Sequence, residues 1–314
     1  MKNIGEVIKN NYHMNKKQLQ DDFNNSLENN TTFKKIVTKL KLPKEYLINY
    51  TTKIEDTSKE LNNCKNCKGL GNCKNSLQGY IYYPEVVNDN LVFDYIPCKY
   101  MQEKIEKDKY KDNIYIYELP KEIKEASMKN IDLDDPKRFE IIKWLKKFID
   151  DYEENKNNKG LYLTGNFGSG KTYLISACLN ELAKKEHKIA IIYYPEFLRS
   201  LKESFNDSEE YNSRFNFIKN IELLLIDDIG AETMTEWSRD EVLGTILQHR
   251  MQEGLTTFFT SNLTIEELEE HFSISSKGVE KVKAKRIIER IKYLTTEMVM
   301  VSSNKRERED KNEK

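Results

Sequence analysis

The segment GNFGSGKT, residues 165–172, constrains the fold of this chain more than any other feature. It matches the pattern G-x-x-x-x-G-K-[ST], begins where the apolar run GLYLTG ends, and precedes a segment with helical periodicity. In such a loop, glycines let backbone amides face a phosphate group, and the N-terminus of the next helix adds its positive dipole end. The pattern therefore predicts a strand, a phosphate-binding loop and a helix, in this order.

The same loop predicts a nucleotide site with ATP and Mg²⁺ as its ligands. We expect Lys171 to reach the β- and γ-phosphates and Thr172 to offer its hydroxyl to Mg²⁺. The residues whose backbone would surround the phosphates are Gly165, Asn166, Phe167, Gly168, Ser169 and Gly170. The alternative is a chance match in a glycine-containing turn, which the flanking strand and helix disfavour.

Strand and helix patterns alternate after this loop. The apolar runs KIAIIYY, IELLLIDD and LTTFFTSN are separated by segments of helical length. Strands separated in this way form a mostly parallel sheet that helices cover on both faces. The sequence therefore predicts an α/β fold.

Two of these runs end in polar residues that suit ATP hydrolysis. In LLLIDDIG, we expect Asp227 to bind Mg²⁺ through water and Asp228 to orient or deprotonate the attacking water, a role usually given to glutamate. In FFTSN, the amide of Asn262 can hold that water against the γ-phosphate, although a Ser-Asn pair after a strand is also ordinary turn chemistry.

The segment KAKRIIERIKYL, residues 283–294, predicts an amphipathic helix that carries Arg286 and Arg290 on one face. One interpretation is a basic face in contact with solvent. The other is that an arginine of one subunit reaches the γ-phosphate held by its neighbour, which predicts self-association through the ATP site.

Four of the five cysteines lie close together in the sequence: Cys64, Cys67, Cys73 and Cys98. Four thiolates suffice for a tetrahedral Zn²⁺ site, and a cysteine cluster in a reducing cytoplasm favours a metal over disulfides. A segment rich in loops and poor in core residues also needs such a support. The alternatives are reactive thiols or buried cysteines.

The polar composition of some segments predicts the domain boundaries. We expect an N-terminal domain over residues 1–105 with its zinc segment at 64–98, a linker over 106–134 marked by the charged stretch QEKIEKDKYKDN, and an ATPase domain over 135–314. The ATPase domain would open with a helix that Asp135 caps.

Charge and hydropathy exclude some classes of partner. The 51 lysines and arginines nearly balance the 52 aspartates and glutamates, so any binding to nucleic acid must be local. An apolar stretch of about 20 residues, which a bilayer requires, is absent from the sequence, and the N-terminus has no apolar signal region. We expect a cytoplasmic protein without a membrane partner.

Several segments, taken together, resemble the bacterial replicative helicase loaders of the DnaI/DnaC group, nearest the DnaI type. They follow one another as GNFGSGKTYL, YYPEFLRSLKESF, LLIDDIGAE, EWSRDEVLGTILQHRM, FFTSNL and KVKAKRIIERIKYL. The resemblance covers about residues 117–306, and the cysteine cluster followed by KNSLQGY is similar to the zinc-containing N-terminal domain of that type. IGAE and YYPEFLRSLK are its most specific parts.

The resemblance implies an AAA+ ATPase with sheet order 5-1-4-3-2. Such a protein binds the hexameric replicative helicase through its N-terminal domain and helps to place it on single-stranded DNA, as a primosome component, when replication begins or restarts. The positions that match the family are Lys171 and Thr172 (Walker A), Asp227 and Asp228 (Walker B), Asn262 (first sensor), and Arg286 and Arg290 (the helix with the arginine finger). Arg306 lies where the family leads us to expect a second sensor, and Lys305 or Arg308 is the alternative for that role. The fourth zinc ligand in the family is either cysteine or histidine, and in this chain we expect it to be Cys98.

The segment 193–202 resembles the part of the family that contacts single-stranded DNA. In it, Tyr193 and Tyr194 would stack on bases while Arg199 and Lys202 meet phosphates. An ordinary strand end followed by an amphipathic helix explains the same residues.

Two other functions remain open from the sequence. An ATP-dependent accessory protein of insertion-sequence transposases shares the ATPase motifs, although the cysteine cluster and IGAE favour the loader. A nucleotide-switched adaptor with little hydrolysis would also accommodate Asp228 in place of glutamate.

Overall fold

The computed structural model describes residues 4–88, 90–117, 119–131, 135–155, 159–275 and 278–302. The chain divides into two compact units, Met1–Asp108 and Lys109–Lys314. In the described part of the chain, no helix has the length and apolar character needed to cross a membrane.

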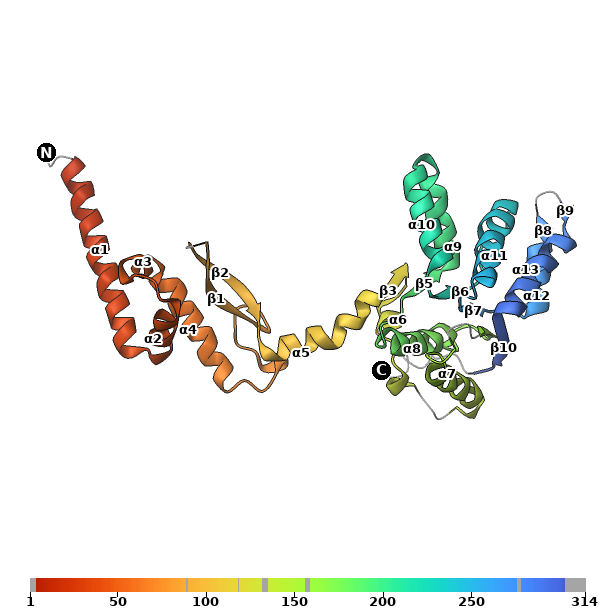
Figure 1. Cartoon of the computed structure of the whole chain (residues 1–314), viewed down its shortest axis with the longest axis horizontal. Helices are drawn as coiled ribbons and strands as arrows, with labels where there is room; N and C mark the ends of the chain where they lie inside the picture. The colour runs from red at the N-terminus through yellow and green to blue at the C-terminus, as the bar shows by residue number, and fades with distance from the viewer. Residues whose placement is uncertain are drawn as a thin grey trace, which may run out of the picture. The chain divides into compact units, whose positions relative to one another are not determined.

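The first unit consists of helices and one β-hairpin (Figure 1). Its elements are α1 (Ile4–Asn29), α2 (Thr31–Leu40), α3 (Lys44–Leu47), η1 (Ile48–Tyr50), α4 (Thr51–Lys65), η2 (Leu70–Asn72), β1 (Tyr80–Val87), β2 (Asn90–Pro97) and α5 (Lys99–Asp108). The Asn30 side chain accepts hydrogen bonds from the amides of Thr32 and Phe33, which fixes the start of α2. Phe23 and Phe33 pack edge to face at the centre of the small core.

The second unit is built on a six-stranded parallel sheet. Its strands are β3 (Ile114–Tyr117), β4 (Gly160–Gly165), β5 (Ile189–Tyr193), β6 (Leu223–Asp227), β7 (Thr257–Ser261) and β10 (Thr295–Met300). Their order in the sheet is β10-β4-β7-β6-β5-β3. The predicted α/β class is confirmed, and the order of the five strands after β3 agrees with 5-1-4-3-2.

Helices and short elements connect these strands. They are η3 (Lys109–Asn113), α6 (Lys121–Lys124), η4 (Met128–Asn130), η5 (Pro136–Arg138), α7 (Phe139–Asp151), α8 (Lys171–Ala183), α9 (Tyr194–Glu203), η6 (Ser204–Asn206), α10 (Ser208–Asn220), the π-helix η7 (Trp237–Leu243), α11 (Gly244–Gln252), α12 (Ile265–Ser273), the hairpin β8 (Ile274–Ser275) and β9 (Gly278–Val279), and α13 (Lys281–Leu294).

Helices cover both faces of the sheet (Figure 1). Side chains alternate along each strand, so Leu161 and Leu163 of β4 pack in one core with α7 and α8. Tyr162 packs in the opposite core with the helices that follow β5. The burial of both faces explains why the central strands are almost wholly apolar.

The segment 106–134, for which the sequence predicts a linker, contains regular structure. The edge strand β3 pairs with β5, and its Ile114 and Ile116 pack against the core beneath the sheet. The charged stretch before it forms the end of α5, a helix without buried residues, and η3. A helix that buries none of its residues completely can have the polar composition of a linker, so composition did not reveal it.

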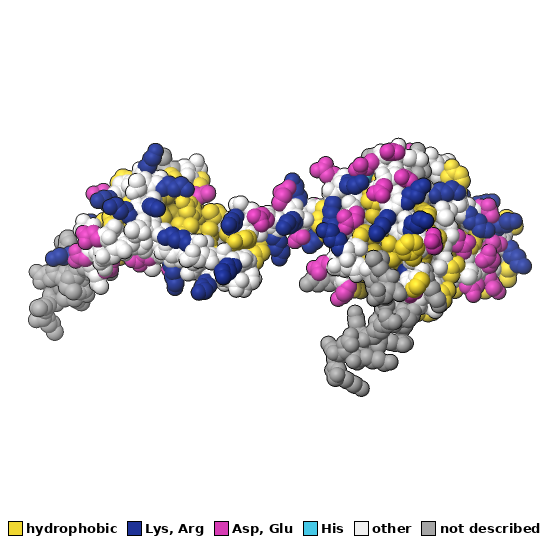
Figure 2. Space-filling model, turned by 90° about the horizontal axis from the view of Figure 1, so that it is seen from below, with side chains coloured by type: hydrophobic (Ala, Val, Ile, Leu, Met, Phe, Trp, Pro, Cys, Tyr) yellow, Lys and Arg dark blue, Asp and Glu magenta, His cyan; other side chains and the backbone are white. Residues whose placement is uncertain are grey.

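Charge is evenly distributed over the visible surface of both units. Basic and acidic side chains are interspersed on the face that Figure 2 shows. On this face, the mixture of charges agrees with the balanced composition of the chain.

Candidate nucleotide-binding site

The loop between β4 and α8 depends on glycine at three positions. Gly165, Gly168 and Gly170 have φ values of 142°, 67° and 89°, which L-residues rarely adopt. A Cβ atom on Gly165 would also lie 2.0 Å from the carbonyl oxygen of Met300 on the neighbouring strand β10. The glycine pattern in the sequence therefore has a direct steric cause.

Lys171 begins α8, and its side chain turns back over the loop. Its Nζ donates hydrogen bonds to the carbonyl oxygens of Gly165 (2.8 Å) and Asn166 (2.9 Å) and to Oδ1 of Asn262 (2.8 Å). Only 7% of Lys171 is exposed. A cation held in this position, beside the N-terminus of a helix, suits an anionic ligand.

Asp227 lies at the end of β6 and connects three elements of the site. The hydroxyls of Thr172 and Thr260 both donate to its Oδ1, each at 2.6 Å. Thr260 comes from β7, which pairs with β6 in the sheet. The contact of Thr260 with Asp227 was not predicted from the sequence, although the motif FFTSN contains Thr260.

Asp228 and Asn262 form a second contact at the ends of the same strands. The Asn262 amide donates to Oδ1 of Asp228 at 2.8 Å while its own Oδ1 accepts from Lys171. Asp228 has a left-handed backbone with φ of 57°, and its amide donates to the Thr260 hydroxyl at 2.9 Å. Asn262 thus links the loop cation to the second carboxylate.

Burial governs the electrostatics of the first carboxylate. It raises the pKa of Asp227, the hydrogen bonds from Thr172 and Thr260 oppose the rise, and the charge of Asp228 adds to it. The Thr172 hydroxyl and the Asp227 carboxylate are hard oxygen donors that fit Mg²⁺, which takes few protein ligands and keeps water and phosphate oxygens.

These residues line a cavity of about 830 Å³, a volume in the range of small-ligand sites. Its other wall comes from the segment for which the sequence predicts a linker, and includes Leu119, Pro120, Ile123 and Ile131. Such an apolar wall next to phosphate-binding groups suits a nucleotide base. In the sequence, this wall corresponds to the apolar residues of ELPKEI and to Ile131.

The arginines of α13 do not line this cavity. Arg286 is exposed, whereas Arg290 is partly buried and donates from Nη1 to the carbonyl oxygen of Gly244 at 2.8 Å. Burial and the nearby charge of Arg286 lower the pKa of Arg290. Arg306 lies outside the described residues.

The four residues expected to contact DNA are in different environments. Tyr194 is fully buried and donates from its hydroxyl to the carbonyl oxygen of Ser238 at 3.2 Å, so it is not available to stack on a base, and this expectation was wrong. Tyr193 lines the nucleotide cavity. Arg199 forms an ion pair with Glu196.

The side-chain Nζ of Lys202, the fourth of these residues, lies 5.4 Å from the ring centroid of Trp237. The sequence does not reveal this cation–π contact, because the two residues are on different elements.

The four clustered cysteines of the first unit are free and partly buried. The Gly79 amide donates to Sγ of Cys73 at 3.3 Å, and Asn75 donates to Sγ of Cys64 at 3.5 Å. Burial raises the pKa of Cys64, and the other three thiols contribute. Within the described residues, however, no three Cys, His, Asp or Glu side chains converge to hold a metal ion, so the predicted zinc site is not shown.

Comparisons with known proteins place this geometry in context. Residues 121–311 match the family model of IstB-like ATP binding proteins. The chain is 38% identical to the replicative helicase loader DnaI of Bacillus subtilis (strain 168) over 257 residues, which cover 81% of this chain and 82% of that protein.

Two solved structures resemble part of the chain. A crystal structure of DnaI matches 62% of this chain and 98% of its own, with 42% identity and a TM-score of 0.55. A protein of Streptococcus pyogenes serotype M3 proposed to be a primosome component matches 63% of this chain and 98% of its own, with 32% identity and a TM-score of 0.54.

Proposed function

The chain belongs to the DnaI/DnaC group of IstB-like ATP binding proteins, and we propose that it is an ATP-dependent loader of the replicative DNA helicase. It would place the hexameric helicase on single-stranded DNA, as a primosome component, when replication begins or restarts. The similarity to the Bacillus subtilis loader carries this proposal, because its 257 residues exceed the length of the 109–314 unit and so reach into the first unit.

The nucleotide site supports ATP hydrolysis by this chain. Lys171 would neutralise the β- and γ-phosphates, and Thr172 and Asp227 would hold Mg²⁺, which supplies positive charge where negative charge develops during phosphoryl transfer. Asp228 would accept a proton from the attacking water. Asn262, which donates to Asp228 at 2.8 Å, would orient both the Asp228 carboxylate and the attacking water.

Two substitutions separate nucleotide binding from hydrolysis. Lys171→Ala should weaken ATP binding about a hundredfold or more, because charge-assisted contacts to the phosphates are lost, with little change in melting temperature. Asp228→Asn should keep the affinity and lose turnover. If Lys171→Ala binds ATP as tightly as the wild type, the assignment of the site is wrong.

The arginines of α13 support action on a neighbouring copy. Arg286 is exposed and does not reach the cavity of its own chain, so a second copy would bring its nucleotide to this surface. Arg286→Ala should then spare ATP binding and lower turnover, since a finger acting between subunits stabilises charge that develops only during transfer. Unchanged turnover would contradict the proposal.

We assign the helicase to the first unit and DNA to the second. Cleavage near the Asp108–Lys109 boundary should yield one fragment that retains the helicase without ATP and another that binds single-stranded DNA with ATP, more weakly as salt rises. Pull-down with the hexameric helicase of the same organism and DNA anisotropy measure the two activities. Retention of helicase by the second fragment alone would reverse the assignment.

Zinc in the first unit remains part of the proposal. The supporting observations are the mutual influence of the four thiols on the pKa of Cys64 and the amide that donates to Cys73. Elemental analysis should find one zinc per chain, and Cys67→Ser should release it and unfold the hairpin region while the ATPase unit stays folded. A metal-free protein that still binds helicase would exclude the site.

Two alternatives have distinct tests. A transposase-accessory ATPase would share the module at residues 121–311, but the similarity that reaches the first unit favours a loader. A neighbouring open reading frame for a transposase would favour the accessory protein. A nucleotide-switched adaptor would show ATP-dependent helicase binding without turnover, whether or not helicase and single-stranded DNA are present.

A further inference from the structure

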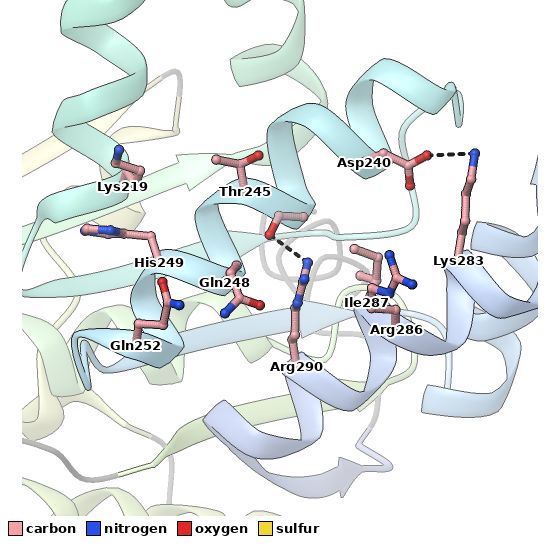
Figure 3. A pocket seen from close by; sticks show the side chains of 11 residues that line it. Lys219, Asp240, Thr245, Gln248, His249, Gln252, Lys283, Arg286, Ile287 and Arg290 are labelled. Atoms are coloured by element: carbon pink, nitrogen blue, oxygen red, sulfur yellow. Dashed lines mark hydrogen bonds and ion pairs between the residues drawn. The ribbon is translucent and has the colours of Figure 1, made fainter.

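The second unit has another cavity, between α10, α11 and α13 (Figure 3). Its volume is about 590 Å³, again in the range of small-ligand sites. Four cations, Lys219, Lys283, Arg286 and Arg290, line it, whereas Asp240 is its only carboxylate among the lining residues. This cavity is separate from the one that contains the phosphate-binding loop.

The acidic groups at this end of the cavity are already paired. Asp240 accepts hydrogen bonds from Nε and Nη2 of the buried Arg239 at 2.7 and 2.9 Å, and lies 3.3 Å from Nζ of Lys283. Glu280 pairs with the same two cations, each at 2.7 Å. These carboxylates therefore neutralise Arg239 and Lys283, whereas Lys219, Arg286 and Arg290 form no ion pair in the described part of the chain.

Arg286 and Arg290 lie on successive turns of α13, on the side that faces α11 (Figure 3). Within the described residues, Arg286 forms no hydrogen bond or ion pair, and Arg290 donates only to the neutral carbonyl oxygen of Gly244. Adjacent guanidinium groups repel each other, most strongly where burial reduces screening. An oxyanion between them would remove this repulsion.

The opposite wall adds a further cation and neutral polar groups. Lys219 of α10 lines this wall together with His249 and Gln248 of α11, and its Nζ lies 6.0 Å from the ring centroid of Phe215 (Figure 3). The His249 ring is held by a hydrogen bond between Nε2 and Oδ1 of Asn220 at 2.8 Å. A ligand in this space would meet positive charge from two sides, with an amide available for its uncharged part.

We propose that this cavity binds a phosphate-bearing small molecule through Arg286, Arg290 and Lys219. Guanidinium groups hold phosphate oxygens with paired hydrogen bonds, and the lysine adds a point charge. A bound ligand would occupy the arginines and so prevent them from acting on the nucleotide of a second copy. The site would thus regulate the proposed ATPase, although its occupancy within one chain does not depend on that function.

The test uses inorganic pyrophosphate and the full-length Lys171→Ala variant, in which the phosphate-binding loop has lost its cation. Calorimetric titration should show one site per chain. Arg290→Gln and Lys219→Gln, each added to this background, should weaken binding about tenfold or more, the effect of losing one charge-assisted contact. Arg199→Gln is the matched control, because this exposed arginine pairs with Glu196 outside the cavity.

The result that overturns the proposal is pyrophosphate binding that is absent from the Lys171→Ala variant or equally tight in all the double variants. Sedimentation velocity measures self-association, and so distinguishes arginines that bind a free phosphate ligand from arginines that contact the nucleotide of a neighbouring copy. Pyrophosphate should suppress ATP-dependent self-association of the wild type. If assembly requires Arg286 but the Lys171→Ala chain binds no pyrophosphate, the arginines serve only the neighbouring copy, and the ATPase proposal stands without this one.

Discussion

Replacement of Thr260 by valine tests how the two carboxylates of the nucleotide site are held. Thr260 is 1% exposed on β7, where its hydroxyl donates to Asp227 at 2.6 Å and accepts from the amide of Asp228 at 2.9 Å. Valine has the same branched shape and suits a buried strand, so the backbone should be preserved. Both hydrogen bonds disappear.

The expected loss of stability follows from the two hydrogen bonds that Thr260→Val removes. A hydrogen bond to a charged group contributes about 1.5–3 kcal/mol, and an amide that loses its buried acceptor costs about 1–3 kcal/mol. Allowing for relaxation, we expect the free energy of unfolding to fall by about 2–4 kcal/mol. Thr295→Val, which removes a buried β10 hydroxyl that donates to the carbonyl oxygen of Ile291 on α13, should cost only about 1 kcal/mol.

The pH dependence gives a second readout. The hydrogen bond from Thr260 lowers the pKa of Asp227 against the effect of burial, so Thr260→Val should raise this pKa further. Turnover with Mg²⁺ needs the charged carboxylate, and its acid limb should therefore shift to higher pH. At neutral pH we expect the Thr260→Val variant to lose turnover by a factor of up to about ten. Thr260→Ser, which keeps the hydroxyl, should restore the turnover of the wild type.

Phosphate release measured across the acidic and neutral range, together with urea denaturation, decides the matter. Our reasoning is refuted if Thr260→Val keeps the acid limb of the wild type and loses no more stability than Thr295→Val.

Three further substitutions follow from the geometry. Gly165→Ala, whose Cβ would lie 2.0 Å from the carbonyl oxygen of Met300, should lower the free energy of unfolding by about 3 kcal/mol or more in chemical denaturation, and wild-type stability would contradict the steric argument. Asp227→Asn should stabilise the nucleotide-free chain by about 0.5–2 kcal/mol at neutral pH. Burial raises the pKa of Asp227 in the folded state, so ionisation of this carboxyl lowers the stability of the wild type as pH rises through that pKa. Thermal scans should therefore show that the stability gained by Asp227→Asn vanishes below the usual pKa of aspartate. A difference in stability that does not depend on pH would refute the raised pKa. Tyr194→Phe, which removes the hydrogen bond to Ser238, should cost about 1 kcal/mol in the same scans and leave DNA affinity unchanged, whereas weaker DNA binding would return this ring to the interface.

Local sequence was enough to predict the centre of the second unit. The P-loop motif at residues 165–172 requires a strand, a turn rich in left-handed backbone and a helix, and these are β4, the glycine loop and α8. The residues Asp227 and Asn262 each follow an apolar run. Since the carboxyl ends of parallel strands meet at one edge of a sheet, their proximity could be expected before any contact was known.

Other features depend on packing between distant segments. The segment 106–134 was predicted to be a linker, yet its residues Leu119, Pro120, Ile123 and Ile131 form an apolar wall of the nucleotide cavity. Tyr194 is adjacent to Tyr193 in the sequence, but only the helix that begins there turns its ring into the core.

The chain by itself thus determined the α/β class and the chemistry at the strand ends, because motif residues act through backbone geometry that neighbouring residues define. Only the tertiary structure decided that Thr260 joins Asp227 to Asp228, and that Arg286 lines a cavity of its own. The cause is that burial and charge pairing depend on which distant side chains occupy the adjacent space, and the spacing of residues along one chain does not contain that information.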